Sequence, residues 1–284
     1  MTDVIEAAEA FSVAAKLNRE DPLRQGSLLR FPNYGQLVMT GDLHGHRRNF
    51  EKLRRFCDLP HAGARHVILH EIIHEELEAL GTVDRSHELL LDAVRWKCEF
   101  PDQIHFLQSN HELAQLQGAE ITKNGRVVTY DFDQGVRETY GDGADRVLEA
   151  IDEFIASLPL AGRTANRVFL SHSLPSPRQL PAFDPTIFSR SPTDEDFSER
   201  GSGYALVWGR YQTKATIDSL CEILDADFFL CGHQPQEMGY DVFHDRQIIL
   251  ASEHDHGVFL PFDLAKPQTI ERLVENIRPF VGVV

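Results

Sequence analysis

Short apolar segments alternate with amphipathic segments along most of this 284-residue chain, and no other sequence feature restricts the fold as strongly. The apolar segments end at polar residues or glycine, which is typical of buried strands. They are residues 36–41, 66–69, 104–108, 167–171, 227–231 and 247–251. Helices are predicted where apolar side chains recur every three or four residues, over 47–57, 87–100, 144–158 and 215–224. This alternation predicts an α/β fold.

We expect one domain over residues 1–284, because the chain shows neither an internal repeat nor a linker. With 42% hydrophobic residues it can bury a substantial core. Residues 1–35 are predicted to be an N-terminal helical extension and residues 36–265 the core, followed by a C-terminal tail over 266–284. The polar, turn-rich segment 189–203 is interpreted as a long surface loop within this domain.

Composition excludes several classes of partner. The formal net charge of −16 at pH 7 argues against nucleic acid, whose binding depends on Lys and Arg contacts to phosphate. No apolar run approaches the ~20 residues that span a bilayer, and the N-terminus does not resemble a signal peptide. We therefore expect a cytoplasmic protein without a membrane partner. The four cysteines form no C-x-x-C pair, so neither a disulfide framework nor a zinc ribbon is indicated.

Side chains that bind metals follow five of the predicted strands directly. The five clusters are GDLHGH (41–46), HE (70–71), SNHE (109–112), SH (171–172) and GH (232–233). Ligands of open α/β sheets bind beyond the carboxyl ends of strands, so we expect these clusters to line one site. Carboxylate, imidazole and amide ligands together suit Mn, Fe or Zn better than Ca or Mg.

Two of these clusters resemble the GDxHG and GNHE blocks of the phosphoprotein phosphatases, a branch of the calcineurin-like metallophosphoesterases. Residues 86–112, 154–177 and 231–240 are also similar to blocks of that family, and together the similar blocks span about residues 36 to 260. The resemblance implies a central β-sandwich flanked by helices, with a metal site at the carboxyl ends of strands. Periodicity alone leaves a single doubly wound sheet as the alternative.

Carried over by position, the resemblance implies a dinuclear metal site and a general acid. It assigns five ligands: Asp42 and His44 to one ion, and Asn110, His172 and His233 to the other. Two ions of Mn, Fe or Zn would activate a water between them for attack on phosphorus. His111 would protonate the leaving alkoxide, although a purely structural role beside Asn110 is the alternative. A phosphorylated substrate is implied, and the similar blocks favour phosphoproteins over small phosphoesters and dinucleoside polyphosphates.

The chain departs from the family at the GDxxDRG block, which normally supplies a bridging aspartate. In its place stands His70-Glu71-Ile72-Ile73-His74-Glu75, and we expect Glu71 to be the bridging carboxylate. His70 or His74 could join or replace it as a ligand, and structural roles for both are equally compatible with the sequence. Glu75 and Asp84 are the next carboxylates to test if Glu71 is not the bridge.

Further positions carry weaker resemblances. GTVDRS (81–86) is similar to the end of the missing block, which would make Asp84 orient His111 and Arg85 bind phosphate, unless both belong to a surface turn. Arg210 follows Trp208 and is the candidate for a second phosphate-binding arginine, with an exposed charge as the alternative. His254 lies where the family has a loop near the metals, although a surface position is the ordinary expectation.

Two other functions compete with the phosphoesterase. HEIIH (70–74) matches the H-E-x-x-H zincin motif, in which two histidines on one helix bind zinc. A non-catalytic binding module that lost the bridging aspartate is the second alternative. Bound metal per chain, together with turnover of p-nitrophenyl phosphate in Mn²⁺, separates the three functions.

Overall fold

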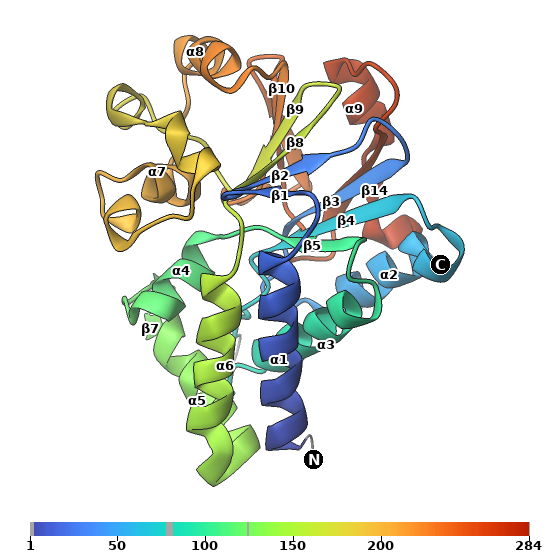
Figure 1. Cartoon of the computed structure of the whole chain (residues 1–284). Coiled ribbons are helices and arrows are strands. Elements are labelled where there is room, and N and C mark those ends of the chain that lie inside the picture. The colour runs from blue at the N-terminus through green and yellow to red at the C-terminus, as the bar shows by residue number, and fades with distance from the viewer. Residues whose placement is uncertain (1–2, 78–81, 124, 284) are drawn as a thin grey trace.

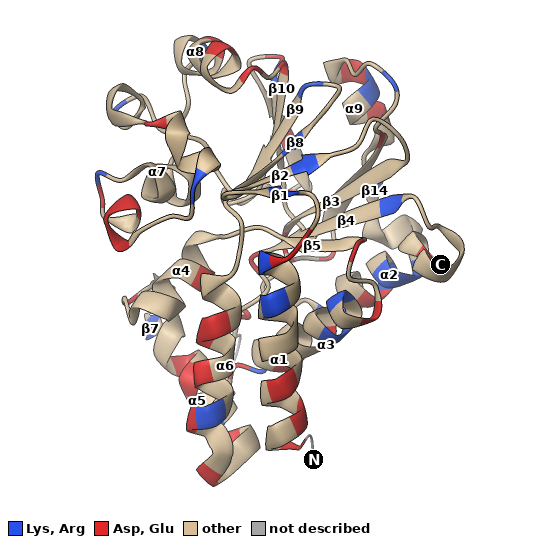
Figure 2. Ribbon diagram, viewed as in Figure 1, with Lys and Arg blue, Asp and Glu red and all other residues tan. Residues whose placement is uncertain are grey.

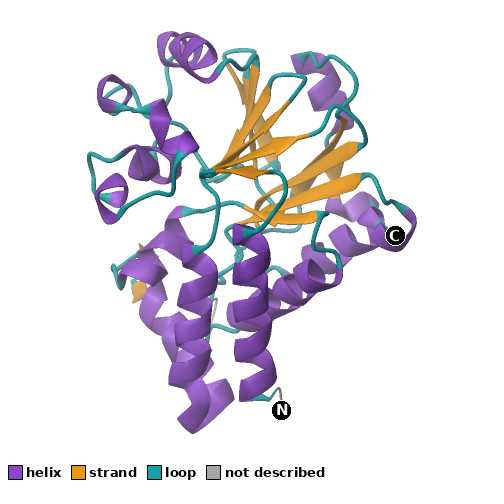
Figure 3. Ribbon diagram, in the orientation of Figure 1, coloured by secondary structure: helices purple, strands orange, loops and turns teal. Residues whose placement is uncertain are grey.

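The computed structural model describes residues 3–77, 82–123 and 125–283 (Figure 1). Two β-sheets form the centre of the molecule and helices lie around them, as the strand and helix colours of Figure 3 show. The predicted α/β architecture with a central β-sandwich is thereby confirmed, and the single doubly wound sheet is excluded. Within the described ranges, no helix combines the length and the apolar composition that crossing a membrane requires.

The larger sheet has seven strands and the smaller has five. In spatial order, the larger consists of β1 (Arg24–Gln25), β2 (Leu28–Phe31), β8 (Ala161–Thr164), β9 (Val168–Ser171), β10 (Phe228–Cys231), β12 (Gln247–Leu250) and β11 (Tyr240–Phe243). The smaller consists of β14 (Arg278–Pro279), β13 (Val258–Asp263), β3 (Gln36–Asp42), β4 (Arg65–His70) and β5 (Ile104–Phe106). A separate hairpin pairs β6 (Thr122–Lys123) with β7 (Arg126–Val127).

Helices cover the outer faces of both sheets. The α-helices are α1 (Val4–Arg19), α2 (Arg47–Cys57), α3 (Ser86–Glu99), α4 (Asn110–Gln117), α5 (Val128–Tyr140), α6 (Ala144–Ala156), α7 (Ser202–Trp208), α8 (Lys214–Leu224) and α9 (Ile270–Asn276). Short 3₁₀ turns are η1 (Leu59–His61), η2 (Gly141–Gly143), η3 (Leu180–Ala182), η4 (Pro185–Ser189), η5 (Asp194–Phe197) and η6 (Phe280–Gly282). Figure 2 shows that most charged residues lie on helices and loops, whereas the strands carry few.

Alternation along the strands explains how one sequence fills three apolar layers. On β4, Val67 and Leu69 pack against the helices below the smaller sheet, whereas Ile68 faces the larger sheet. On β9, Leu170 faces the smaller sheet and Phe169 packs against the layer that contains α8. Successive side chains of a strand point to opposite faces, so strands buried on both faces appear as continuous apolar runs. These are the runs from which the strands were predicted.

The carboxyl ends of five strands meet at one edge of the sandwich. Strands β3, β4 and β5 are parallel neighbours in the smaller sheet, and β9 and β10 are parallel neighbours in the larger. A bridge between Asp42 and Ala251 ties the end of β3 to the end of β12. Side chains that follow these five strands therefore come from both sheets to a common edge.

Both ends of the chain contribute more regular structure than predicted. Residues 24–31, expected within a helical extension, form β1 and β2, and β2 pairs in parallel with β8. In the expected tail, β14 pairs with β13. The segment 189–203 contains η5 and the start of α7, and the guanidinium of Arg190 pairs with both carboxylate oxygens of Asp196 at 2.6 and 2.7 Å.

A buried polar network anchors the segment after α1 to the smaller sheet. Asp21 Oδ2 lies 2.9 Å from His105 Nδ1 and 3.4 Å from Lys97 Nζ. The other ring nitrogen of His105 is 3.1 Å from Nδ1 of His66. Lys97 is fully buried, so its ammonium depends on Asp21 and on the carbonyl of Pro101, which accepts its hydrogen bond at 2.7 Å.

Candidate metal centre

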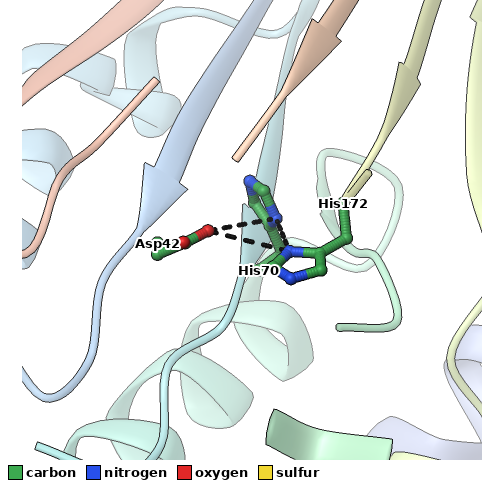
Figure 4. A group of neighbouring side chains, drawn as sticks. All are labelled: Asp42, His70 and His172. Carbon is green, nitrogen blue, oxygen red and sulfur yellow. Dashed lines mark hydrogen bonds and ion pairs between the residues drawn. The ribbon is translucent and has the colours of Figure 1, made fainter. Parts of the chain in front are cut away.

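Asp42, His70 and His172 form one side of a buried cluster at the shared edge (Figure 4). Asp42 Oδ1 lies 4.0 Å from His70 Nδ1 and 3.7 Å from His172 Nδ1. The two Nδ1 atoms are 3.2 Å apart. Asp42 ends β3, His70 ends β4 and His172 follows β9, so three strand ends from two sheets meet here.

A second group of donors surrounds the other nitrogen of His172. His172 Nε2 lies 2.6 Å from Asn110 Oδ1 and 3.1 Å from His233 Nδ1. Asn110 Oδ1 is in turn 2.8 Å from His233 Nδ1. Asn110 is the first residue of α4 and His233 follows β10, so this group also draws on both sheets.

Glu71 lies between this second group and a third one. Its Oε2 is 2.7 Å from His172 Nε2, whereas its Oε1 is 3.4 Å from His44 Nε2 and 3.3 Å from His111 Nε2. The two oxygens of one carboxylate therefore face different sets of nitrogens. Glu71 is 2% exposed, and this burial keeps water from screening its charge.

The backbone at this edge is bent in ways that place the side chains. Positive φ angles occur at His44 (41°), Glu71 (48°) and His233 (71°), a conformation that costs non-glycine residues energy and that is found at functional sites. A Cβ atom on Gly232 would lie 2.2 Å from Asp42 Oδ1. Glycine at this position lets the backbone N–H of His233 donate to the carboxylate of Asp42 at 2.8 Å.

Burial determines the charge of the cluster. It lowers the pKa of His44, His70 and His233 to about 3, so these rings are neutral at pH 7 and each keeps a lone pair. Burial also raises the pKa of Asp42 and of Glu71, and nearby carboxylates raise both further. Two buried carboxylates are costly as anions unless a cation accompanies them. Neutral imidazoles, an amide oxygen and buried carboxylates are a donor set that fits bound metal ions.

The structure brings together the predicted metal-site residues but not all of the predicted supporting residues. Asp42, His44, Glu71, Asn110, His111, His172 and His233 all lie within the groups described above. Asp84 was expected to orient His111, yet its Oδ1 accepts a hydrogen bond from the backbone of Ser86 at 2.7 Å. His74 occupies the expected place instead, with its Nδ1 2.8 Å from His111 Nδ1.

The physical reason for this correction is the path of the chain after β4. Residues 71–77 adopt no helix or strand, and His74 has a φ of 64° that turns its ring toward α4. The carboxylate of Glu112 on α4 holds this path by accepting from the backbone N–H of Ile72 at 2.8 Å. A zincin requires both histidines of HEIIH on one helix, and these residues form none.

The arginines and His254 lie in different surroundings. Arg85 is half-exposed, and its guanidinium contacts Thr139 Oγ1 at 3.1 Å and Glu88 at 3.3 Å rather than a member of the cluster. Arg210 lies close enough to the cluster for its positive charge to lower the pKa of His233, after the larger effect of burial. The ring of His254 donates from Nε2 to the carbonyl of Gln236 at 2.9 Å.

Sequence reasoning missed several residues around the cluster. Glu112 belongs to the recognised SNHE cluster, but its support of residues 72 and 73 requires the fold to be known. Glu253 raises the pKa of Asp42 by its negative charge, an effect second to burial. A cavity of about 420 Å³ beside His44 is lined by His44, Gly45, His46, Glu75, Glu76, Lys123, Glu253, His254 and Asp255. His44 is the member of the cluster that lines this cavity.

The sandwich brings buried nitrogen and oxygen donors from both sheets to one edge. The sequence model of the calcineurin-like phosphoesterases matches residues 36–237, and the chain belongs to this family. The predicted resemblance to its phosphoprotein phosphatase branch is confirmed. The chain is 20% identical over 281 residues to the serine/threonine-protein phosphatase C23G10.1 of Caenorhabditis elegans, a match that covers 86% of this chain. It spans only 56% of that relative's length.

Solved structures share the fold at low sequence identity. A protein serine/threonine phosphatase from Saccharomyces cerevisiae, with similarity to human phosphatase PP5, superposes with a TM-score of 0.68 and 16% identity. The match covers 91% of this chain and 82% of that one. The cold-active protein-tyrosine phosphatase of a Shewanella species gives a TM-score of 0.56 and 14% identity, over 88% of this chain and 80% of its own. These likenesses establish the shared architecture.

Proposed function

We propose that the protein hydrolyses phosphoesters with two metal ions held in the buried cluster, and that phosphoserine and phosphothreonine proteins are its substrates. The observation that carries the proposal is the position of Glu71, whose two carboxylate oxygens face two separate sets of nitrogens. Two cations in close approach need an anion between them to offset their repulsion, and Glu71 supplies one.

The proposed ligand sets follow the resemblance, with Glu71 shared between them. Asp42, His44 and Glu71 would hold one ion, and Glu71, Asn110, His172 and His233 would hold the other. Nitrogen and oxygen donors in this mixture favour Mn, Fe or Zn. When bound, the ions supply positive charge that lowers the pKa of water and neutralises the phosphoryl oxygens.

His111 is proposed to donate the proton that the leaving alkoxide requires. Its Nε2 faces the cluster, and its Nδ1 is held by His74. Burial lowers the pKa of His111, and the charges of His44 and His74 lower it further, whereas the negative charge of a bound phosphoester would oppose these shifts. Protonating the leaving oxygen from Nε2 leaves a neutral ring with the contact to His74 intact.

Arg210 is proposed to contact the phosphoryl oxygens, because it brings a permanent positive charge close to His233 and Asp42. The carry-over of a phosphate-binding role to Arg85, and of an orienting role to Asp84, has no support from their contacts. The preference for phosphoserine and phosphothreonine is supported by the resemblance to the phosphoprotein phosphatase blocks and by the Caenorhabditis elegans relative.

Metal analysis and turnover test the proposal together. We expect about two ions per chain after loading with Mn²⁺, hydrolysis of p-nitrophenyl phosphate, and release of phosphate from phosphoserine and phosphothreonine peptides. Asp42→Asn is the control, which should lose both metal and turnover. Two ions without turnover on any phosphoester would support the binding module instead. Turnover confined to phosphotyrosine peptides would overturn the proposed substrate class while leaving the metal chemistry intact.

A further inference from the structure

His70 and His74 flank Glu71 and are each 1% exposed. The function proposed above gives His70 no part and gives His74 only its contact with His111. Each makes a ring-to-ring contact with a histidine of the cluster: His70 with His172, and His74 with His111. In both contacts the two facing atoms are Nδ1. A neutral imidazole has one nitrogen that donates and one that accepts, so each contact fixes which ring carries its proton on Nδ1.

The backbone determines the tautomer of His70. Its Nε2 lies 2.9 Å from the carbonyl oxygen of Thr40, which can only accept, so Nε2 carries the proton. Nδ1 of His70 is then a lone pair, and His172 must donate to it from Nδ1 across 3.2 Å. His172 Nε2 faces the acceptor oxygens of Asn110 and Glu71 at 2.6 and 2.7 Å, so it is free of a proton when a cation lies among these atoms.

A side-chain amide determines the tautomer of His74 in the same way. Gln115 donates from Nε2 to Asp133 Oδ1 at 2.8 Å, which orients its carbonyl oxygen toward His74. That oxygen lies 2.9 Å from His74 Nε2, so Nε2 donates and Nδ1 is a lone pair. His111 therefore donates from its own Nδ1, and its Nε2 lone pair faces Glu71.

His44 shows the same arrangement with a backbone acceptor. Its Nδ1 donates to the carbonyl of Ile73 at 2.9 Å, which leaves Nε2 unprotonated beside Glu71. Residues 70–74 thus supply the acceptors for three histidines of the cluster as well as the carboxylate at its centre. Acceptors of this kind orient the rings that bind a metal and fix their tautomers.

We propose that His70 and His74 are positioning residues that hold His172 and His111 in the Nδ1–H tautomer, with Nε2 free to face the proposed metals and substrate. The inference rests on the proposed metal centre, because a bound cation is what leaves Nε2 of His172 without a proton beside the oxygens of Asn110 and Glu71. An imidazole accepts this hydrogen bond without adding a negative charge. A carboxylate at either position would add one beside Asp42 and Glu71, both already buried.

Nitrogen-15 NMR of the histidine rings in the unaltered protein, loaded with Zn²⁺, tests the inference directly. Two-bond proton–nitrogen correlations distinguish the tautomers. We expect Nδ1–H rings at His172 and His111, and Nε2–H rings at His70 and His74. An Nε2–H ring at His172 or at His111 overturns the inference. If Zn²⁺ binds and the expected tautomers are found but no phosphoester is hydrolysed, the inference stands and the proposed function fails. If Zn²⁺ does not bind, both fail.

Variants test whether the acceptor matters for metal binding. His70→Leu removes it, whereas His70→Asn places an amide oxygen near the position of Nδ1. We expect His70→Leu to weaken Zn²⁺ binding about 10–100-fold and His70→Asn to recover much of that loss. His66→Leu is the matched control, because His66 lies on the same strand and pairs with His105 outside the cluster. Equal losses in His70→Leu and His70→Asn, or no loss in either, would contradict the positioning role.

The corresponding variants of His74 act on His111 instead. His74→Leu should leave His111 with a mixture of tautomers in the ring spectrum, whereas His74→Asn should keep the Nδ1–H form. Zn²⁺ content should stay at the wild-type level in both variants, because His111 is not one of the proposed ligands. A His111 spectrum unchanged by His74→Leu would overturn the inference for this pair.

Discussion

Glu71 is the side chain that both halves of the proposed centre share. Gln in its place keeps the volume but removes the negative charge between the two ions. We expect Glu71→Gln to lose at least one of the two bound metals and nearly all turnover, measured as metal per chain and as hydrolysis of p-nitrophenyl phosphate. Glu75→Gln, a change of a neighbouring carboxylate, should retain two metals. A Glu71→Gln enzyme with two metals and the wild-type rate would require a different bridge.

His111 should affect the chemical step rather than metal binding. Loss of a general acid costs about 10²–10⁴-fold in rate, so His111→Ala should lower kcat on an alkyl phosphoester by that amount. The loss on p-nitrophenyl phosphate should be smaller, because its leaving group needs less protonation. Metal content, measured alongside, should not change. Equal losses on both substrates would argue for a structural role of His111.

Arg210 and Arg85 form a natural pair for comparison, since only Arg210 lies close to the cluster. A hydrogen bond to a charged group contributes about 1.5–3 kcal/mol, which corresponds to roughly 10–100-fold in kcat/KM. We expect Arg210→Ala to lower kcat/KM by that factor with unchanged metal content, and Arg85→Ala to change it little. A larger loss of kcat/KM in Arg85→Ala than in Arg210→Ala would support the phosphate-binding role that the sequence predicts for Arg85.

Much of the cluster was predictable because strand ends carry ligands to a common edge whatever the details of the loops. The partner of His111 was not. GTVDRS (81–86) resembles the missing block in sequence, but the side chain beside His111 is that of His74. His74 reaches this position through its positive φ and through the support that Glu112 gives to the backbone before it. Neither feature leaves a pattern in the sequence.

At the scale of elements, Asp21 links the segment after α1 to α3 and β5. Burial would raise the pKa of Asp21, but the hydrogen bond and charge of His105, with the charge of Lys97, lower it from 3.8 to about 2. A carboxylate whose pKa is lower in the folded state than in the unfolded state stabilises the fold at pH values above its unfolded-state pKa. That stabilisation is lost as the pH falls through the folded-state pKa. The link therefore weakens between about pH 4 and pH 2.

Urea unfolding of the wild type and of Asp21→Asn at several pH values measures this contribution. We expect the wild type to lose about 2 kcal/mol of unfolding free energy between pH 4 and pH 2 that Asp21→Asn does not lose. Asp58→Asn, which changes an exposed aspartate, should retain the full pH dependence. Parallel curves for the wild type and Asp21→Asn would show that the network adds no stability of this kind.

Elements with long apolar runs were predicted and those without them were not. The strands β3, β4, β5, β9, β10 and β12 are buried on both faces and coincide closely with the predicted runs. By contrast, β1 and β14 are only two residues long, and β13 is interrupted by Pro261. These strands form because they pair with strands that are distant in the sequence. The local pattern of apolar residues does not predict such pairing.

At the scale of the whole molecule, the proposed ligands join two sheets that otherwise meet through apolar packing. Ligands that bind only the folded state stabilise it, by about 2.7 kcal/mol at a concentration ~100-fold above Kd. We expect EDTA to lower the Tm by several degrees, with faster hydrogen exchange at the ends of β3, β4, β9 and β10. Asp42→Asn should show no response to EDTA. A Tm of the wild type that EDTA leaves unchanged would contradict metal bridging of the sheets.

The order in which the strands leave the ribosome bears on how the protein acquires its ions. Asp42 and His233, which meet through a backbone hydrogen bond, are separated by 191 residues. At ~5–20 residues per second, translation takes roughly 10 to 40 s to cover that distance. During this time a nascent chain displays Asp42, His44 and Glu71 without the later histidines. The complete set of proposed ligands would therefore be present only after β10 and His233 have emerged.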